Sequence, residues 1–472
     1  MFQTVLLNNI ALAKQNMKQH IRVQRSKSSK AVTLVTTLDG RKHMKALQRR
    51  TLLTATAVLA TVGLAVTALP AQAAEVGVTS SQIKLGMTLP MTGTASLGYN
   101  KIPGAAKAYF DYLNANGGIN GRKVTLVVKD DRYVPTEAVS KTNELILKDK
   151  VMALLAPLGT ANVKAVASSV NPARRGVPVL FVNTGFSGFA DTKKYPTTYT
   201  VLPSYIMEAK IMGQYIKDNF AGKKIGLLYQ DDDFGIDALA GFKTAGVNFA
   251  VKVPYASGSQ SAASAAGWIT KFKAAEADVV ILFGVSSATS AMLGTAAQLG
   301  YKPQWMLGSV GGDATTLKLT GVPAGVLYNA IGFSPVPATT DMTDEYVKFF
   351  SDIYAKAVPG SAFDLNVLLG MNTAFMTAQA LKAAGPNPTR KSLMAAIDSK
   401  GATFASSALV PAGYSKTSHV GLTGYWVGKY APTGDLAPIG GTYVTYTTDS
   451  GSGPVVKSTY KRPAMPAKGL PN

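Results

Sequence analysis

Short apolar runs rich in β-branched residues recur along the chain, and most are followed by a polar loop and then by an amphipathic or alanine-rich stretch. Runs of this length and composition predict buried strands, and the stretches between them predict helices. Strands that alternate with helices form a parallel sheet covered on both faces. The pattern therefore predicts an α/β fold, with strands at 83–87, 122–129, 151–155, 177–182, 224–229, 247–253, 279–283, 305–307 and 326–333.

The pattern restarts near Thr200, so the predicted elements form two units of similar size. After the last run, Ser334 to Pro337 predicts a stiff, extended connection, because proline restricts both itself and the residue before it. The remaining chain predicts three helices at 344–358, 366–384 and 391–399, two or three short strands within 421–460, and a mobile, proline-containing tail at 461–472.

Polar loops that contain glycine follow many of these runs, at the carboxyl ends of the predicted strands. Ligands bind at this edge of open α/β sheets, because helix N-termini and free backbone N–H groups converge there. The first such loop, 90–98, places Thr and Ser hydroxyls beside glycines, which suits a small polar group. The alternative is that these residues only form turns and helix caps. Recurrence of the pattern at 156–162, 183–188, 230–235, 284–287 and 308–313 favours a binding site.

The N-terminal region has the order of a secretory signal peptide. A basic segment, 45–50, precedes an apolar stretch, 52–69, and Ala71-Gln72-Ala73 follows at once. We expect cleavage after this small-x-small site. A transmembrane anchor is the alternative, because a stretch of this length can span a bilayer, but many of its residues are only Ala, Thr and Gly. Residues 1–43 form a basic leader, so leader and signal peptide together fill residues 1–73.

Charge and composition exclude several classes of function. The formal charge is +22, but eleven basic residues and one acidic residue precede Ala74, so the remainder carries +12. These charges are dispersed, whereas nucleic-acid-binding proteins cluster basic residues among aromatic ones. Cysteine is absent, and His419 is the one histidine after the leader. This composition excludes a cysteine nucleophile and a cysteine-ligated zinc, and it leaves one histidine for a Ser-His-Asp triad. We expect no enzyme, no cofactor, no metal and no nucleic-acid partner.

Three segments carry a resemblance to a known family. They are Ile83-Lys84-Leu85-Gly86 with the following Pro90-Met91-Thr92-Gly93, then Ala115-Asn116-Gly117-Gly118-Ile119-Asn120-Gly121-Arg122, and then Asp231-Asp232-Asp233-Phe234-Gly235. Through them the chain resembles the solute-binding proteins of bacterial ABC importers, in the branched-chain amino-acid (Leu/Ile/Val-binding) branch of the type I periplasmic binding proteins.

The resemblance implies two doubly wound parallel-sheet lobes joined by three crossovers, with the ligand cleft between the lobes. The crossovers would fall near Thr200, Phe333 and Thr423. Lobe one would then hold 78–200 plus 333–423, and lobe two would hold 201–332 plus 424–460.

The ligand contacts that the resemblance implies fall on the strand-end loops of both lobes. In amino-acid binders of this family, hydroxyls and backbone N–H groups of lobe one hold the carboxylate, and an acid of lobe two holds the ammonium. Ser309 stands where that acid is expected, and Asp313 lies four residues further on. The resemblance therefore leaves open an α-amino acid, an aromatic acid, an amide or another small organic solute. The implied contacts are Ser96, Leu97, Tyr99, Gly159, Thr160, Ala161, Thr184, Gly185 and Phe186 from lobe one, and Asp232, Phe234, Ser286, Ser287, Ser309 and Asp313 from lobe two.

The run Asp231 to Asp233 admits several interpretations from the residues alone: a ligand contact, a metal site, an acid–base pair, or a solvated turn and helix cap. Two functions remain open. The first is an exported receptor that binds a small organic solute and delivers it to an ABC permease in the inner membrane. The second is an exported ligand-sensing subunit of a membrane signalling receptor. We expect a periplasmic monomer in both cases.

Overall fold

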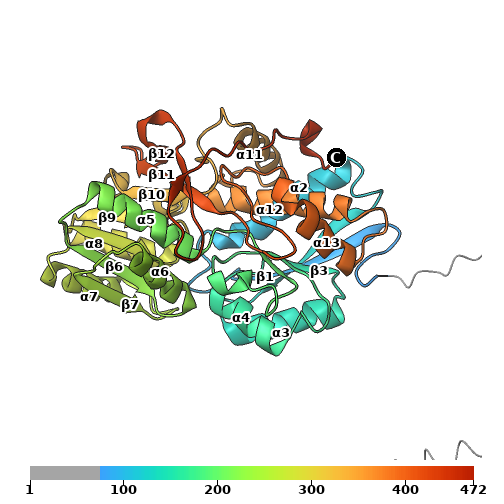
Figure 1. Cartoon of the computed structure of the whole chain (residues 1–472), viewed down its shortest axis with the longest axis horizontal. Coiled ribbons are helices and arrows are strands. Elements are labelled where there is room, and N and C mark those ends of the chain that lie inside the picture. The colour runs from blue at the N-terminus through green and yellow to red at the C-terminus, as the bar shows by residue number, and fades with distance from the viewer. Residues whose placement is uncertain (1–74) are drawn as a thin grey trace, which may run out of the picture. The chain divides into compact units, whose positions relative to one another are not determined.

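The computed structural model describes residues 75–472 (Figure 1). The expected leader and signal peptide, residues 1–73, lie outside the described residues. Among residues 75–472, none of the helices is long and apolar enough to cross a membrane.

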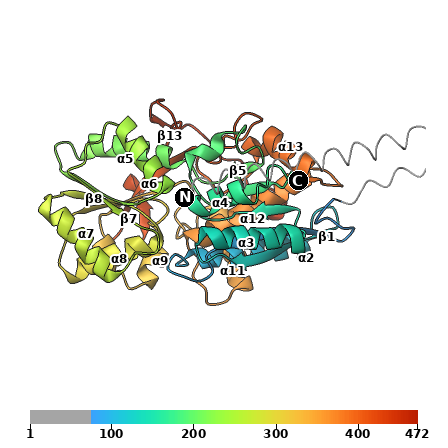
Figure 2. The ribbon, with the colours of Figure 1, turned by 90° about the horizontal axis from the view of Figure 1, so that it is seen from below.

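The first sheet consists of five parallel strands in the order β2-β1-β3-β4-β5. Strand β1, which lies between β2 and β3, is buried along most of its length, as expected for a parallel strand with helices on both faces. Helices α3 and α4 pack on one face, and α2 and α12 pack on the other (Figures 1 and 2). The strands are β1 (Gln82–Leu89), β2 (Lys123–Asp130), β3 (Ala153–Leu155), β4 (Val179–Val182) and β5 (Thr198–Thr200), and the helices are α2 (Ile102–Ala115), α3 (Pro135–Asn143), α4 (Thr160–Ser169), α11 (Glu345–Ala357), α12 (Leu365–Ala383) and α13 (Arg390–Lys400).

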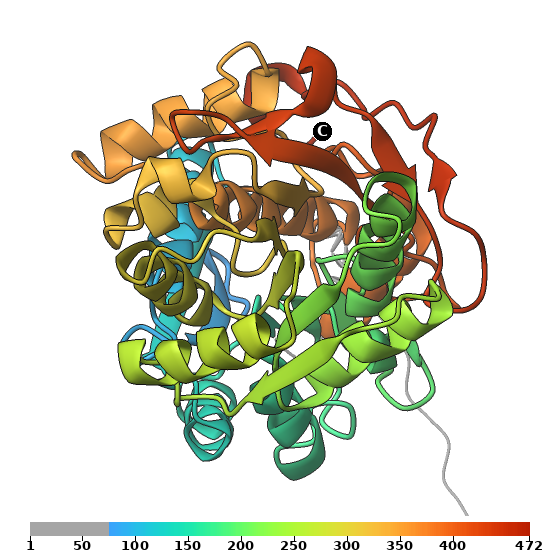
Figure 3. The ribbon, with the colours of Figure 1, turned by 90° about the vertical axis from the view of Figure 1, so that its left-hand side faces the viewer.

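The second sheet runs in the order β14-β13-β11-β10-β9-β8-β6-β7, with β12 paired to β11. Strands β6 to β10 are parallel, and β11 to β14 add antiparallel strands at one edge. Figure 3 views this sheet and the helices on its two faces. The strands are β6 (Ile225–Gln230), β7 (Val251–Tyr255), β8 (Val279–Phe283), β9 (Gln304–Leu307), β10 (Ile331–Ser334), β11 (Gly424–Tyr430), β12 (Leu436–Pro438), β13 (Thr445–Thr447) and β14 (Val456–Lys457), and the helices are α5 (Tyr205–Asn219), α6 (Asp233–Thr244), α7 (Ala262–Ala274), α8 (Ser286–Gln298), α9 (Ala314–Leu319) and α10 (Ala324–Leu327).

Three connections join the part of the molecule built on the first sheet, hereafter lobe one, to the part built on the second sheet, hereafter lobe two. The first follows β5, the second follows β10 and the third precedes β11. The first and third run side by side, because Gly421 N–H donates to Thr200 Oγ1 at 2.8 Å and Leu422 N–H donates to the Val201 carbonyl at 3.2 Å. The Trp426 indole of β11 donates to the Val336 carbonyl at 2.7 Å and ties the strand after the third connection to the second connection.

The predicted α/β fold class, with two largely parallel sheets, is confirmed. The predicted strand 326–333 is partly wrong: residues 326–327 end helix α10, and only residues 331–333 belong to β10. The break between them is at Asn329, whose φ of 66° interrupts an extended strand. The C-terminal region holds four short strands in place of the two or three expected.

The segment 461–472, expected to be a mobile tail, packs on lobe one in the structure. Tyr109 of α2 donates its hydroxyl to the Gly469 carbonyl at 2.9 Å, and Tyr346 of α11 donates to the Pro463 carbonyl at 2.9 Å. Arg462 forms an ion pair with Asp344. The chain therefore returns from β14 in lobe two to the surface of lobe one, which is a fourth crossing beyond the three connections described above.

Candidate ligand-binding site

The carboxyl ends of the parallel strands of both lobes meet around one group of polar side chains, which we name the interlobe cluster. Pairwise contacts connect its members across the lobe boundary. Such a meeting of strand ends is where open α/β sheets bind ligands. The interlobe cluster comprises Tyr99, Tyr133, Thr160 and Thr184 of lobe one, and Tyr205, Gln230, Asp232, Tyr255 and Ser286 of lobe two.

A pair of threonine hydroxyls forms the lobe-one side of the cluster. Thr160 begins α4 and Thr184 follows β4, and their Oγ1 atoms lie 2.6 Å apart. Both residues are almost completely buried, with exposures of 2% and 0%. The N–H groups of the first turn of α4 have no partners within the helix and lie at the positive end of its dipole. The two hydroxyls and this helix end together suit an anionic group.

Gly159 shapes the approach to this helix end. Its φ is 100°, a left-handed conformation that L side chains rarely adopt, and a Cβ there would lie 2.6 Å from Cε2 of Tyr133. Glycine is therefore required both by the backbone and by the ring that lies over it.

Tyr99 joins the two lobes directly. Its hydroxyl donates to the Val310 carbonyl at 3.0 Å and accepts the N–H of Ser286, the first residue of α8, at 3.3 Å. Burial raises the pKa of Tyr99 to about 12, so the phenol stays neutral and remains a donor. Tyr255, the last residue of β7, accepts the Val285 N–H at 3.0 Å, and burial also raises its pKa.

The three aspartates 231–233 lie in three different environments. Asp231 is exposed. Asp232 caps α6 by accepting the Phe234 N–H at 2.9 Å, and its other oxygen accepts from Gln230 Nε2 at 2.7 Å. Asp233 forms an ion pair with Lys164 of lobe one. Burial raises the pKa of Asp232, and it is the carboxylate of lobe two that belongs to the interlobe cluster.

Other residues expected at the site surround the cluster or lie apart from it. Gly185 packs against Tyr205, whose ring leaves no room for a Cβ, and the Phe234 ring lies 4.4 Å from the Tyr205 ring between centroids. Ser96 donates to the Gly93 carbonyl within its own loop. Four other expected contact residues are half-buried. Leu97 lies two residues before Tyr99 and Ala161 directly after Thr160 in the sequence, the Phe186 ring packs against Phe189, and Ser287 accepts a hydrogen bond from Gln260.

Ser309 contacts an acid that the sequence analysis missed. The Glu208 carboxylate of α5 accepts from the Ser309 N–H at 2.5 Å, from the Ser309 hydroxyl at 3.0 Å and from the Tyr425 hydroxyl at 3.2 Å. Glu208 is completely buried, and burial raises its pKa to about 7. Its oxygens are engaged by donors of the protein itself.

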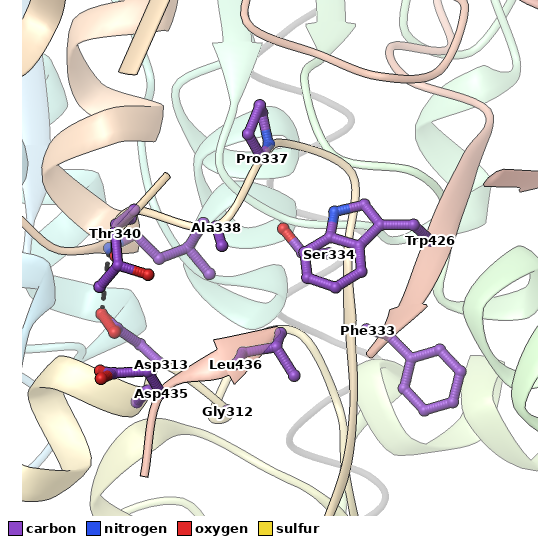
Figure 4. A pocket seen from close by; sticks show the side chains of 13 residues that line it. Gly312, Asp313, Phe333, Ser334, Pro337, Ala338, Thr340, Trp426, Asp435 and Leu436 are labelled. Carbon is purple, nitrogen blue, oxygen red and sulfur yellow. Dashed lines mark hydrogen bonds between the residues drawn. The ribbon is translucent and has the colours of Figure 1, made fainter. Parts of the chain in front are cut away.

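Asp313 also lies at the lobe boundary, but it is not a member of the interlobe cluster. It caps α9 through the Thr315 N–H at 2.9 Å, and its Oδ2 accepts the N–H of Leu365 in lobe one at 3.1 Å, drawn as a dashed line in Figure 4. The adjoining cavity measures about 30 Å³ and is lined by Trp426, Leu436 and the second connection. This volume has room for about one or two water molecules and is too small for an organic solute.

Five residues that matter in this geometry escaped the sequence analysis. Gln230 and Tyr255 are the last residues of β6 and β7, and Tyr205 is the first residue of α5, so their places at element ends were a usable signal. Tyr133 and Glu208 gave no such signal, because one depends on an unusual backbone and the other lies inside a helix.

Comparison with known proteins places the chain in a known family. The family model described as "Periplasmic binding protein" matches residues 82–435, and the chain belongs to this family. As a member of this family, the protein is a binding receptor rather than an enzyme.

Individual similarities are distant. The Leu/Ile/Val-binding protein homolog 7 of Brucella abortus (strain 2308) is 24% identical over 326 residues, which are 66% of this chain and 79% of that protein. The structure of a branched-chain amino acid ABC transporter protein from Thermus thermophilus with bound valine has a TM-score of 0.69 at 17% identity, covering 79% of this chain and 98% of that one. A solute-binding protein of an ABC transporter from Rhodopseudomonas palustris BisB5, in complex with 3,4-dihydroxy benzoic acid, has a TM-score of 0.65 at 20% identity, covering 75% and 95%. The two structures hold different ligands.

Proposed function

We propose that the protein is the exported receptor of an ABC import system, which binds a small organic acid, amino acid or related amide between its lobes in the periplasm and delivers it to a permease in the inner membrane. The observation that carries this proposal is the buried Thr160–Thr184 hydroxyl pair at the N-terminus of α4. A neutral pair of hydroxyls beside free N–H groups is an arrangement that binds a carboxylate without a fixed positive charge.

The opposite end of the ligand would face lobe two. Asp232 is the carboxylate of the interlobe cluster, and it lies near the tyrosine hydroxyls. An ammonium or amide N–H group of the ligand would pair with it, because a buried cation needs a carboxylate partner. Glu208 is a weaker candidate for this role, since Ser309 and Tyr425 already donate to it.

The experiment combines a thermal-shift screen with calorimetry. Amino acids, aromatic acids and amides are screened first, since a ligand that binds the folded state raises its melting temperature by mass action. The best ligand is then titrated into Thr160→Ala and Thr184→Val. We expect each variant to lose about 1–3 kcal/mol of binding, because part of the anion is left unpaired.

Thr270→Ala is the matched control, because its hydroxyl bonds only the Ala266 carbonyl on the exposed side of α7. It should bind as tightly as the unchanged protein. Equal affinity of all three variants would rule out the anion site at α4.

A further inference from the structure

Tyr133 has an unusual backbone for a residue with a large side chain. Arg132 and Tyr133 are consecutive non-glycine residues in the left-handed region, with φ of 51° and 64°. Such conformations are uncommon outside glycine, and they concentrate at functional sites, where the surrounding structure enforces them.

Two aspartates hold this turn in place. Asp130 Oδ1 accepts the Arg132 N–H at 2.9 Å, and Asp131 Oδ1 accepts the Tyr133 N–H at 2.9 Å, so each aspartate bonds the backbone two residues further on. Asp130 also accepts from the N–H of Met91 at 2.9 Å and from the Thr92 hydroxyl at 2.6 Å, which anchors the turn to the β1–α2 loop. Pro135 begins α3 directly afterwards and fixes the other side.

The strained turn directs the Tyr133 side chain across the site. A Cβ on Gly159 would lie 2.6 Å from Cε2, 3.3 Å from Cδ2 and 3.4 Å from Cζ of the ring, so the ring lies on the backbone at the N-terminus of α4. Burial, and then the Asp232 charge of lobe two, raise the pKa of the Tyr133 phenol, so this ring also lies near lobe two. The side chain therefore lies between the anion-binding end of lobe one and lobe two.

We propose that Tyr133 is the residue that limits the size of the ligand, a role that rests on the solute-binding function proposed above. The ring fills space between the helix end and Asp232 that a longer or aromatic ligand would need. The site accordingly takes compact solutes with a short apolar part, and it excludes solutes that carry an aromatic ring.

The test uses two pairs of probes that differ in bulk: valine with phenylalanine, and isobutyrate with benzoate. Calorimetry measures the affinity ratio of the larger to the smaller member for the full mature chain. Tyr133→Gly removes the ring and fits the left-handed backbone, and Tyr133→Asn is a second small variant that tolerates the same backbone. Tyr133→Phe keeps the ring without its hydroxyl.

Arg132→Gly is the matched control, because it relaxes the same turn at an exposed side chain and leaves the ring in place. We expect the ratio to rise at least tenfold in Tyr133→Gly and Tyr133→Asn for the pair that binds, and to stay within twofold in Tyr133→Phe and Arg132→Gly.

An unchanged ratio in both small variants, with the smaller probe still bound, overturns the size limit alone. An equal rise of the affinity ratio in Arg132→Gly also overturns the size limit, because the backbone of the turn and not the Tyr133 ring would then set the selectivity. Failure of every protein to bind any of the four probes contradicts the proposed function, and the size limit falls with it.

Discussion

Replacement of Tyr99 by phenylalanine removes one oxygen atom from the contact between the lobes. In the structure that hydroxyl donates to the Val310 carbonyl at 3.0 Å and accepts the Ser286 N–H at 3.3 Å, and Tyr99 is only 5% exposed. Both partners belong to lobe two. If the lobes separate, water replaces these hydrogen bonds, so the substitution destabilises the closed form and leaves an open form almost unaffected.

The magnitude follows from two neutral, buried hydrogen bonds. Each contributes about 0.5–1.5 kcal/mol, so the closed form loses about 1–3 kcal/mol relative to the open form. A ligand that binds the closed form then loses the same free energy, which corresponds to a roughly 5- to 150-fold rise in Kd. Calorimetry with the ligand found by the screen measures this change.

Tyr354→Phe provides the control for Tyr99→Phe. The Tyr354 hydroxyl bonds Ser361 at 2.9 Å within lobe one, so its loss should affect stability but not Kd. A Kd for Tyr99→Phe equal to that of the unchanged protein would refute the reasoning that this hydroxyl holds the lobes together.

Two further predictions concern stability. Burial, and then the neighbouring Asp364 carboxylate, raise the pKa of Asp313 to about 7, whereas an unfolded aspartate titrates near about 4. The folded state therefore binds the extra proton, so the free energy of unfolding should fall as pH rises from about 4 to about 7, and Asp313→Asn should flatten this fall in urea melts. If the free energy of unfolding falls with pH as steeply in Asp313→Asn as in the unchanged protein, other buried acids cause the pH dependence. Removal of residues 461–472 should lower the free energy of unfolding by about 2–4 kcal/mol, because the hydrogen bonds of Tyr109 and Tyr346 and the Arg462–Asp344 ion pair are lost. An unchanged calorimetric melting curve would contradict this packing.

Regular elements could be predicted from the sequence where apolar periodicity is strong. The strand 279–283 has the predicted bounds, because all five residues are apolar and buried. Thr160 and Thr184 could be expected near each other, because both follow neighbouring parallel strands and such strands end at one edge of the sheet.

The missed residues depend on contacts between distant parts of the chain. Two local aspartate-to-backbone hydrogen bonds form the left-handed turn at Tyr133. Asp130 also anchors this turn to the distant β1–α2 loop, and the sequence does not reveal that contact. Glu208 lies in the middle of a helix, where periodicity does not reveal a buried acid that accepts from Ser309 and Tyr425. The prolines of 461–472 predict an extended segment, but they do not predict the surface of α2 and α11 that it covers.

Small-angle X-ray scattering of the mature chain, with and without a saturating ligand from the screen, tests the central claim most directly. If a solute binds between the lobes and shifts the balance to the closed form, the radius of gyration should fall on saturation, and the scattering curve should then match the structure described here. A radius of gyration that stays at an open value while calorimetry shows full occupancy would contradict closure of the two lobes around the ligand.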